Sequence, residues 1–241
     1  MPSLYSFWTL KIEEDSNCLV KIKIRKRVDM SIRHIGIAGH IGVGKSSLTQ
    51  ILSQEFNIEP FHEPNLKNPF LTRFYQDMPT WAFRSQVFFL VHKFNAHQAF
   101  LDKNIPMIQD RTIYEDAEVF AQHLCQSDCM SDDEFKTYCA LYEEFIQLLP
   151  PPNLMIYLRA RVDTLFDRIQ DRGRPEEKEI PSVYMESLYT LYESWFNKYD
   201  RSNKLVIDVD DLDFVHSKKD RSHIINLVKE HLVHHFDFKS I

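Results

Sequence analysis

The sequence predicts an α/β fold in which helices flank a doubly wound, five-stranded parallel sheet. Five short apolar runs have the continuous hydrophobicity of strands that are buried on both faces. Longer stretches with helical periodicity separate these runs, and this alternation is typical of consecutive βα units. A chain of 241 residues with 44% hydrophobic side chains is also long enough to bury a substantial core in one such domain.

The predicted strands cover residues 34–39, 58–62, 106–109, 153–158 and 204–209. The predicted helices cover residues 45–56, 80–101, 113–124, 132–149, 162–172, 181–199 and 216–235. Residues 30–241 are expected to form the folded domain, since Met30 lies just before the first strand. Residues 1–29 are expected to be an N-terminal extension of unknown role, because they lack the apolar segment of a signal peptide.

The turn after the first strand carries a phosphate-binding motif. In the segment HIGIAGHIGVGKSS, the residues Gly39, Gly44, Lys45 and Ser46 form the pattern G-x-x-x-x-G-K-S between an apolar run and a helical run. Glycines allow successive N–H groups to face an anion, and the helix start adds its positive dipole end. Lys45 is expected to reach the β- and γ-phosphates of a nucleoside triphosphate, and Ser46 to place its hydroxyl on Mg²⁺. The expected nucleotide-binding residues of this loop are Gly39, His40, Ile41, Gly42, Val43, Gly44, Lys45, Ser46 and Ser47.

Charged residues follow the other strands at the edge where ligands of such sheets bind. Asp110 comes after the third strand and suits coordination of Mg²⁺, and it can also form an ion pair with Arg111. Glu63 follows the second strand, where it can accept a proton from an alcohol or act as a helix N-cap acid before Pro64. The residues alone leave both interpretations of Glu63 open.

Three arginines predict a mobile, arginine-rich lid. Arg168 and Arg172 are i,i+4 neighbours near the end of a predicted helix, and Arg174 follows them. Gly173 and Pro175 within this run favour mobility, so the guanidinium groups can close over a transferring phosphoryl group and offset its charge. The alternative is a solvated basic helix end that the helix dipole favours.

Composition and cysteine usage narrow the class of protein and its location. The net charge of −6 argues against general nucleic-acid affinity. The sequence contains no apolar run of roughly 18 residues that would predict a membrane span. The cysteines follow no secreted disulfide pattern, so we expect Cys125, Cys129 and Cys139 to be buried, reduced thiols on helices of a cytoplasmic protein. A metal site that includes His123 with Cys125 and Cys129 is the alternative.

The order of the motifs resembles that of the deoxynucleoside kinases, especially the bacterial deoxyadenosine/deoxyguanosine kinases. The match extends from Ile32 to about Phe236 and consists of GHIGVGKSS, HEP, NPFLTRFYQDMPTWAFRSQVFFL, DRTIYEDAEVF, RIQDRGRPEE, IPSVYMESLYTLYESW and DLDF. The resemblance implies a P-loop NTPase-type fold. It also implies an enzyme that uses ATP and Mg²⁺ to phosphorylate the 5′-hydroxyl of a 2′-deoxynucleoside in nucleotide salvage.

The resemblance implies roles for residues on both sides of the reaction. Glu63 matches the general base for the sugar 5′-hydroxyl, and Tyr75 and Glu177 match the pair that holds the 3′-hydroxyl. Asp213 and Phe214 match the loop that touches the adenine of the donor. Asp110 and Arg111 match a motif that serves Mg²⁺ and the phosphates. The residues expected to act in catalysis are Glu63, Lys45, Arg111, Arg168, Arg172 and Arg174.

Three residues match the pocket for the acceptor's nucleobase, and a fourth departs from the family's pattern. Gln86 matches the residue that makes paired hydrogen bonds to the base, Phe120 the ring that stacks on it, and Asp116 an acid that lines its pocket. Lys93 stands where the family usually has an arginine, and a lysine cannot offer a planar bidentate fork. The resemblance favours a purine deoxynucleoside, with thymidine or deoxycytidine as the alternative, because an amide such as that of Gln86 can pair with several bases.

Two other classes of protein fit the sequence less well. A nucleoside monophosphate kinase needs cations for the acceptor's phosphate, whereas the acceptor side here offers acidic and neutral residues. A GTP-dependent switch needs N-K-x-D after an apolar strand, but residues 197–200 follow a helical pattern, and D-x-x-G is absent from the sequence. We expect the partners to be a small-molecule deoxynucleoside and a second copy of the chain in a homodimer, without nucleic acid or membrane.

Overall fold

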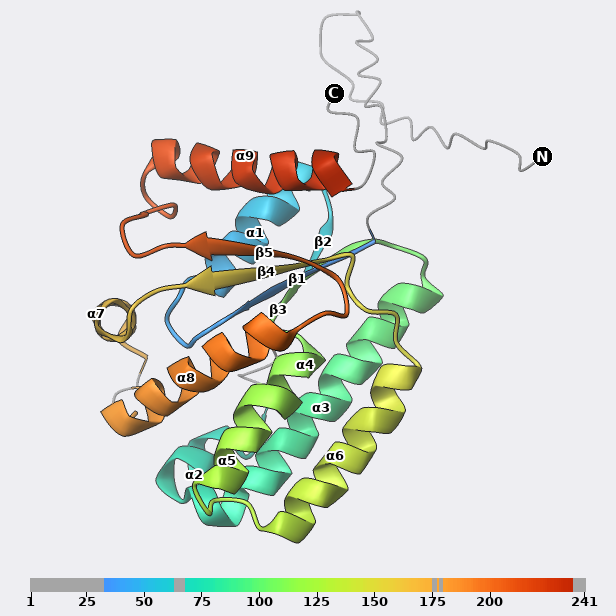
Figure 1. Cartoon of the computed structure of the whole chain (residues 1–241), viewed down its shortest axis with the longest axis vertical. Coiled ribbons are helices and arrows are strands. Elements are labelled where there is room, and N and C mark those ends of the chain that lie inside the picture. The colour runs from blue at the N-terminus through green and yellow to red at the C-terminus, as the bar shows by residue number, and fades with distance from the viewer. Residues whose placement is uncertain (1–32, 63–67, 175–176, 178–179, 236–241) are drawn as a thin grey trace, which may run out of the picture. The chain divides into compact units, whose positions relative to one another are not determined.

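The structure is a computed structural model that describes residues 33–62, 68–174, 177 and 180–235. These residues belong to one compact unit. Five parallel strands form a sheet in the order β2-β3-β1-β4-β5 (Figure 1). Their bounds are β1 (His34–Gly39), β2 (Glu59–Phe61), β3 (Met107–Asp110), β4 (Leu154–Arg159) and β5 (Asn203–Asp208). The predicted parallel α/β sheet is therefore confirmed.

The burial of each strand agrees with its position in the sheet. All residues of β1 and β3 are buried, as is expected of strands that are covered on both faces, whereas β2 and β5 carry exposed residues at the sheet edges. β1 pairs with β3 on one side and with β4 on the other. In this register Ile37 lies opposite Asp110, so β3 ends beside the start of the loop that follows β1.

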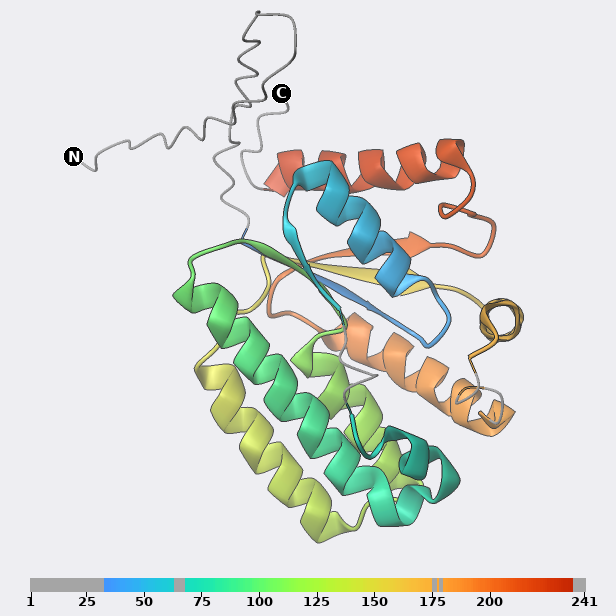
Figure 2. The ribbon, with the colours of Figure 1, turned by 180° about the vertical axis from the view of Figure 1, so that it is seen from behind.

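Helices cover both faces of the sheet. Their bounds are α1 (Lys45–Phe56), α2 (Leu71–Gln76), α3 (Met78–Asp102), α4 (Ile113–Glu115), α5 (Gln122–Gln126), α6 (Asp132–Gln147), α7 (Val162–Arg172), α8 (Ser182–Lys198) and α9 (Lys218–His235), with a π-helix, η2, at Asp116–Ala121. Helices α1 and α9 lie on one face, and α3, α4 and α8 lie on the other (Figure 1 and Figure 2). Every helix in the described part of the chain is too short or too polar for a membrane span.

Two helical predictions differ from the structure. The predicted continuous helix over 113–124 is interrupted by η2, where the Gln122 N–H donates to the Ala117 carbonyl five residues earlier. Helix α2 was not predicted, because six residues are too few to show a helical period.

The predicted burial of the thiols is also wrong, since Cys125, Cys129 and Cys139 are only half-buried. Cys129 lies in the turn before α6 rather than on a helix, because Ser131 caps the next helix start.

A buried pair of histidines lies between the start of β1 and α3. The rings of His34 and His97 meet edge to face with their centroids 4.6 Å apart. His34 Nε2 lies 2.9 Å from Gln109 Oε1, which fits an N–H donated to the amide oxygen. Burial lowers the pKa of His97 to about 4, and burial together with the neighbouring His97 lowers the pKa of His34 well below its ordinary value. Both rings are therefore neutral in the folded chain at pH 7.

We expect these histidines to make the fold sensitive to acid. Between pH 6.5 and about 4 the unfolded chain binds a proton at His97 that the folded chain does not, so the free energy of unfolding falls as the pH falls. The shift at His97 alone corresponds to about 3 kcal/mol. In urea unfolding at a series of pH values, His97→Phe should flatten this dependence, whereas the same change at the exposed His223 should not. Equal pH slopes for the native chain and His97→Phe would contradict the assignment.

Candidate active site

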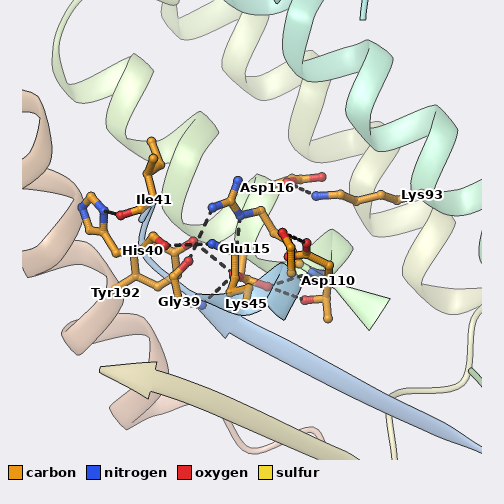
Figure 3. Close-up of polar contacts among 12 residues, drawn as sticks. Gly39, His40, Ile41, Lys45, Lys93, Asp110, Glu115, Asp116 and Tyr192 are labelled. Carbon is orange, nitrogen blue, oxygen red and sulfur yellow. Dashed lines mark hydrogen bonds and ion pairs between the residues drawn. The ribbon is translucent and has the colours of Figure 1, made fainter. Parts of the chain in front are cut away.

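The phosphate-binding motif runs from Gly39, the last residue of β1, to Ser47 in the first turn of α1, and residues 40–44 form a tight loop between the two elements. Gly39, Gly42 and Gly44 have φ values of 142°, 84° and 102°, which L side chains rarely adopt. A Cβ atom on Gly44 would lie 2.7 Å from the Phe214 ring, so a larger residue does not fit there. Lys45, which is buried, donates from Nζ to the His40 carbonyl at 2.8 Å and closes the loop on itself (Figure 3). The loop thus has the glycine conformations and the lysine of a phosphate cradle.

His40 fastens this loop to helix α8. Its Nε2 lies 2.9 Å from the Met185 carbonyl, which fits a donated N–H, and its ring centroid lies 5.8 Å from that of Tyr192. Burial lowers the pKa of His40 to about 4, so the ring is neutral at pH 7. The second residue of the motif therefore contributes packing and a hydrogen bond rather than positive charge.

Asp110 and Ser46 bring two oxygen ligands together at the end of β3. Ser46 Oγ donates to Asp110 Oδ2 at 2.5 Å. Asp110 is 3% exposed, and its Oδ1 has no hydrogen-bond partner among the residues that the structure describes. His62 Nδ1 lies 4.0 Å from Asp110 Oδ2, and this contact raises the pKa of His62. A hydroxyl and a carboxylate with an unused oxygen form the kind of donor set that Mg²⁺ takes.

Arg111 contacts both the phosphate loop and the ring of Phe120. Its φ of 63° is left-handed, its Nη2 donates to the Gly39 carbonyl at 3.4 Å, and its guanidinium lies 4.6 Å from the centre of the Phe120 ring. Its Nε lies 3.8 Å from Oε1 of Glu115, a fully buried carboxylate. Burial raises the pKa of Glu115, and the Arg111 guanidinium opposes that change. Glu115 was not among the predicted site residues, although its spacing from Thr112 matches a capping box, S/T-x-x-E.

A pocket at this edge of the sheet gathers most of the predicted site. The predicted residues that line it are Ile41, Gly42, Lys45, Ser46, Tyr75, Gln86, Asp110, Arg111, Asp116, Phe120, Arg172, Arg174 and Glu177. Tyr184 of α8 also lines the pocket and was not predicted, because nothing in the periodicity of that helix distinguishes it from the aromatic residues of the core. The structure thus brings the phosphate loop, the end of β3, helix α3, η2 and the arginine-rich segment to one place.

The part of the pocket assigned to the nucleobase contains a buried amide and a buried ion pair. Gln86 is 4% exposed, and its Oε1 lacks a hydrogen-bond partner within the described part of the chain. Lys93 Nζ donates to Asp116 Oδ1 at 2.5 Å, with both side chains buried (Figure 3). Lys93 itself does not line the pocket, but it fixes the carboxylate of Asp116, which does.

Two of the predicted lid arginines contact the predicted sugar-binding acid. Arg172 donates from Nε to Glu177 Oε2 at 3.1 Å, and Arg174 Nη1 lies 3.5 Å from Glu177 Oε1. Glu177 is 9% exposed, whereas the arginine side chains are about a third exposed or more. These local ion pairs fix the two guanidinium groups beside the Glu177 carboxylate, and all three side chains line the pocket.

Arg168 lies elsewhere. Its guanidinium donates to the carbonyls of Val43, at 3.4 Å, and Val209, at 2.5 Å. It thereby connects the phosphate loop to the loop that follows β5. Phe214, from the same loop, is buried against Gly44, and Asp213 accepts a hydrogen bond from the His216 N–H at 3.0 Å.

Glu63 lies outside the residues that the structure describes, so its place in the site stays a prediction. Ser47 follows Ser46 in the first turn of α1. His62, one residue before Glu63, lies close to Asp110 and ends the described part of that segment.

Comparisons with known proteins agree with this geometry. The sequence profile of the family described as "Deoxynucleoside kinase" matches residues 35–234. Deoxyguanosine kinase of Bacillus subtilis (strain 168) is 35% identical over 207 residues, which are 83% of this chain and 97% of that protein. Deoxyadenosine/deoxycytidine kinase of the same organism is 31% identical over 196 residues, 80% of this chain and 90% of that protein.

A solved structure extends the likeness to three dimensions. Deoxyadenosine kinase from M. mycoides with bound dATP superposes with a TM-score of 0.70 at 30% identity, over 81% of this chain and 98% of that one. The resemblance seen in the motifs is thus confirmed by family, by relatives and by fold. The chain belongs to the deoxynucleoside kinase family.

Proposed function

We propose that this chain transfers the γ-phosphoryl group of ATP to the 5′-hydroxyl of a 2′-deoxynucleoside, and that purine deoxynucleosides are its preferred acceptors. The observation that carries this proposal is the shared pocket, in which Lys45 and Ser46 of the phosphate loop lie beside Gln86 and Phe120. A donor and an acceptor bound there would meet next to Asp110 and Arg111. Bringing the two reactants together in this way is the main contribution an enzyme makes to phosphoryl transfer.

On the donor side, the loop N–H groups and Lys45 would bind the phosphates, and the segment with Asp213 and Phe214 would contact the adenine. Ser46 and Asp110 would hold Mg²⁺, and this role is supported by Asp110 Oδ1, which has no hydrogen-bond partner among the described residues. When bound, Mg²⁺ neutralises charge on the β- and γ-phosphates. Arg111 would add a guanidinium where negative charge develops during transfer.

On the acceptor side, Glu63 would accept the proton of the 5′-hydroxyl, and Tyr75 with Glu177 would hold the 3′-hydroxyl. The Phe120 ring would stack on the base, and the Gln86 amide would pair with the edge of the base. A buried amide oxygen left without a partner costs about 1–3 kcal/mol, so a base that donates to it gains affinity.

The preference for purines rests on the relatives, and the amide of Gln86 is compatible with it. Proteins similar to this chain are named for deoxyguanosine and for deoxyadenosine. The adenine edge offers a donor at N6 beside an acceptor at N1 or N7, which matches the two ends of a side-chain amide. Lys93 already donates to Asp116, so it acts on the base through the position of that carboxylate. We therefore place deoxyadenosine and deoxyguanosine before thymidine and deoxycytidine.

Initial rates with ATP, Mg²⁺ and each of the four deoxynucleosides at equal concentration test this proposal. We expect the highest kcat/KM with a purine deoxynucleoside. Glu63→Gln serves as a control for the origin of the activity and should lower turnover about 10²–10⁴-fold, the usual effect of losing a positioned base. A higher kcat/KM with thymidine or deoxycytidine would reject the purine preference but not the kinase activity. Near-normal turnover of Glu63→Gln would reject the base assignment.

The lid proposal predicts a specific kinetic effect at Arg172. If its guanidinium meets the transferring phosphoryl group, Arg172→Ala should lower kcat by about 10²–10³-fold, because the charge it offsets is greatest during transfer. The Kd of the deoxynucleoside, measured by calorimetry, should change by less than about threefold. Arg161→Ala is a matched control, since Arg161 also pairs with a carboxylate, that of Asp210, at the opposite end of α7. Equal losses of affinity and turnover would indicate ground-state binding instead.

A further inference from the structure

The Glu115 carboxylate takes no part in the steps proposed above, yet it is fully enclosed at the centre of the site. Its Oε1 accepts hydrogen bonds from the Gly39 N–H at 3.2 Å and the Tyr192 hydroxyl at 3.0 Å (Figure 3). Its Oε2 accepts from the N–H and the hydroxyl of Thr112, at 2.8 and 3.2 Å. Two donors on each oxygen match the accepting capacity of an ionised carboxylate. Glu115 therefore joins the phosphate loop, α8 and the start of α4.

The same carboxylate constrains Arg111 in two ways. Oε1 lies 3.8 Å from Arg111 Nε, so the negative charge faces the guanidinium directly. Arg111 has a left-handed φ of 63°, which is unfavourable for a residue with a side chain. The next residue of that turn is held in place because the Thr112 N–H donates a hydrogen bond to Glu115. Arg111 in turn donates to the Gly39 carbonyl. Both main-chain groups of Gly39 are thus bonded to residues 111 and 115.

We propose that Glu115 is a positioning residue for phosphoryl transfer, whose carboxylate holds the Arg111 guanidinium and the first residue of the phosphate loop in one fixed geometry. This inference rests on the proposed function, in which Arg111 meets phosphates that the loop binds. Misplacing a reacting group by about 1 Å can lower turnover about 100-fold. The loss should appear in kcat, because the groups that bind the deoxynucleoside are not moved.

Two substitutions separate the charge of Glu115 from its reach. Glu115→Gln keeps the shape, but it removes the charge that faces Arg111 and turns one accepting oxygen into a donor. Glu115→Asp keeps the charge, but the side chain is one methylene group shorter, so the carboxylate lies further from Arg111. Glu118→Gln is the matched control, because Glu118 Oε1 accepts from the Tyr142 hydroxyl at 2.6 Å, three residues further along, while its side chain does not line the pocket.

The experiment is a double-mutant cycle between residues 115 and 111. kcat, with saturating ATP and Mg²⁺, and the calorimetric Kd of deoxyadenosine are measured for the three variants in the native chain and in Arg111→Lys. Circular dichroism measures the folded fraction of each variant, and kcat is divided by this fraction. We expect Glu115→Gln to lower kcat about 10–100-fold in the native chain but less than about threefold in Arg111→Lys, because the group it positions is already lost. Kd should change less than about threefold, and Glu118→Gln should leave kcat unchanged.

The outcomes separate this role from a purely structural one. A structural role predicts a lower Tm with unchanged corrected kcat, or a loss of kcat that is equal in both Arg111 backgrounds, and either result would overturn the inference. If Glu115→Gln does not fold, Glu115→Asp in the same cycle decides, since it must show the same dependence on Arg111. A native chain that does not phosphorylate any deoxynucleoside would count against the proposed function and is visible before any variant is made.

Discussion

The site depends on one junction, in which the N–H and the carbonyl of Gly39 both form hydrogen bonds with side chains of the segment that follows β3. Its N–H donates to Glu115 and its carbonyl accepts from Arg111. This junction exists because β1 and β3 are adjacent parallel strands whose carboxyl ends meet. The phosphate loop, Asp110 and Arg111 therefore share one rigid edge of the sheet. Rigid placement matters here, since phosphoryl transfer depends on position and electrostatics more than on covalent chemistry.

Around this rigid edge the fold arranges groups of two different kinds. The phosphate loop offers main-chain N–H groups, which recognise phosphate without regard to the base. Helix α3 and η2 offer side chains, with Gln86 buried on α3 and Asp116 and Phe120 on the π-helix. The end of α7 and the residues after it add Arg172 and Arg174, which form local ion pairs with Glu177. Under the proposed function, the fold would separate general phosphate binding from selective recognition of the acceptor.

Much of the fold and part of the site could be predicted from the sequence. The ends of the strands were predicted to within one residue, because buried parallel strands are continuous apolar runs. The phosphate loop was predicted because its motif is local in sequence. Glu115 was missed because its importance comes from Gly39 and Tyr192, which are distant in sequence. The π-helix η2 at Asp116–Ala121 was not predicted, because the apolar pattern of this segment is also that of an ordinary α-helix. The contacts of Arg168 with two loop carbonyls are likewise tertiary, and Glu63 remains a prediction.

The central claim is that one pocket binds ATP and a deoxynucleoside side by side across Asp110 and Arg111. Calorimetric binding of a bisubstrate compound, in which an oligophosphate chain joins the 5′ oxygens of adenosine and deoxyadenosine, tests it most directly. We predict one molecule bound per chain, competition with both ATP and deoxyadenosine, and an affinity at least about 100-fold tighter than that of either substrate alone. Binding that is no tighter than that of ATP, or competition with only one of the two substrates, would contradict the account.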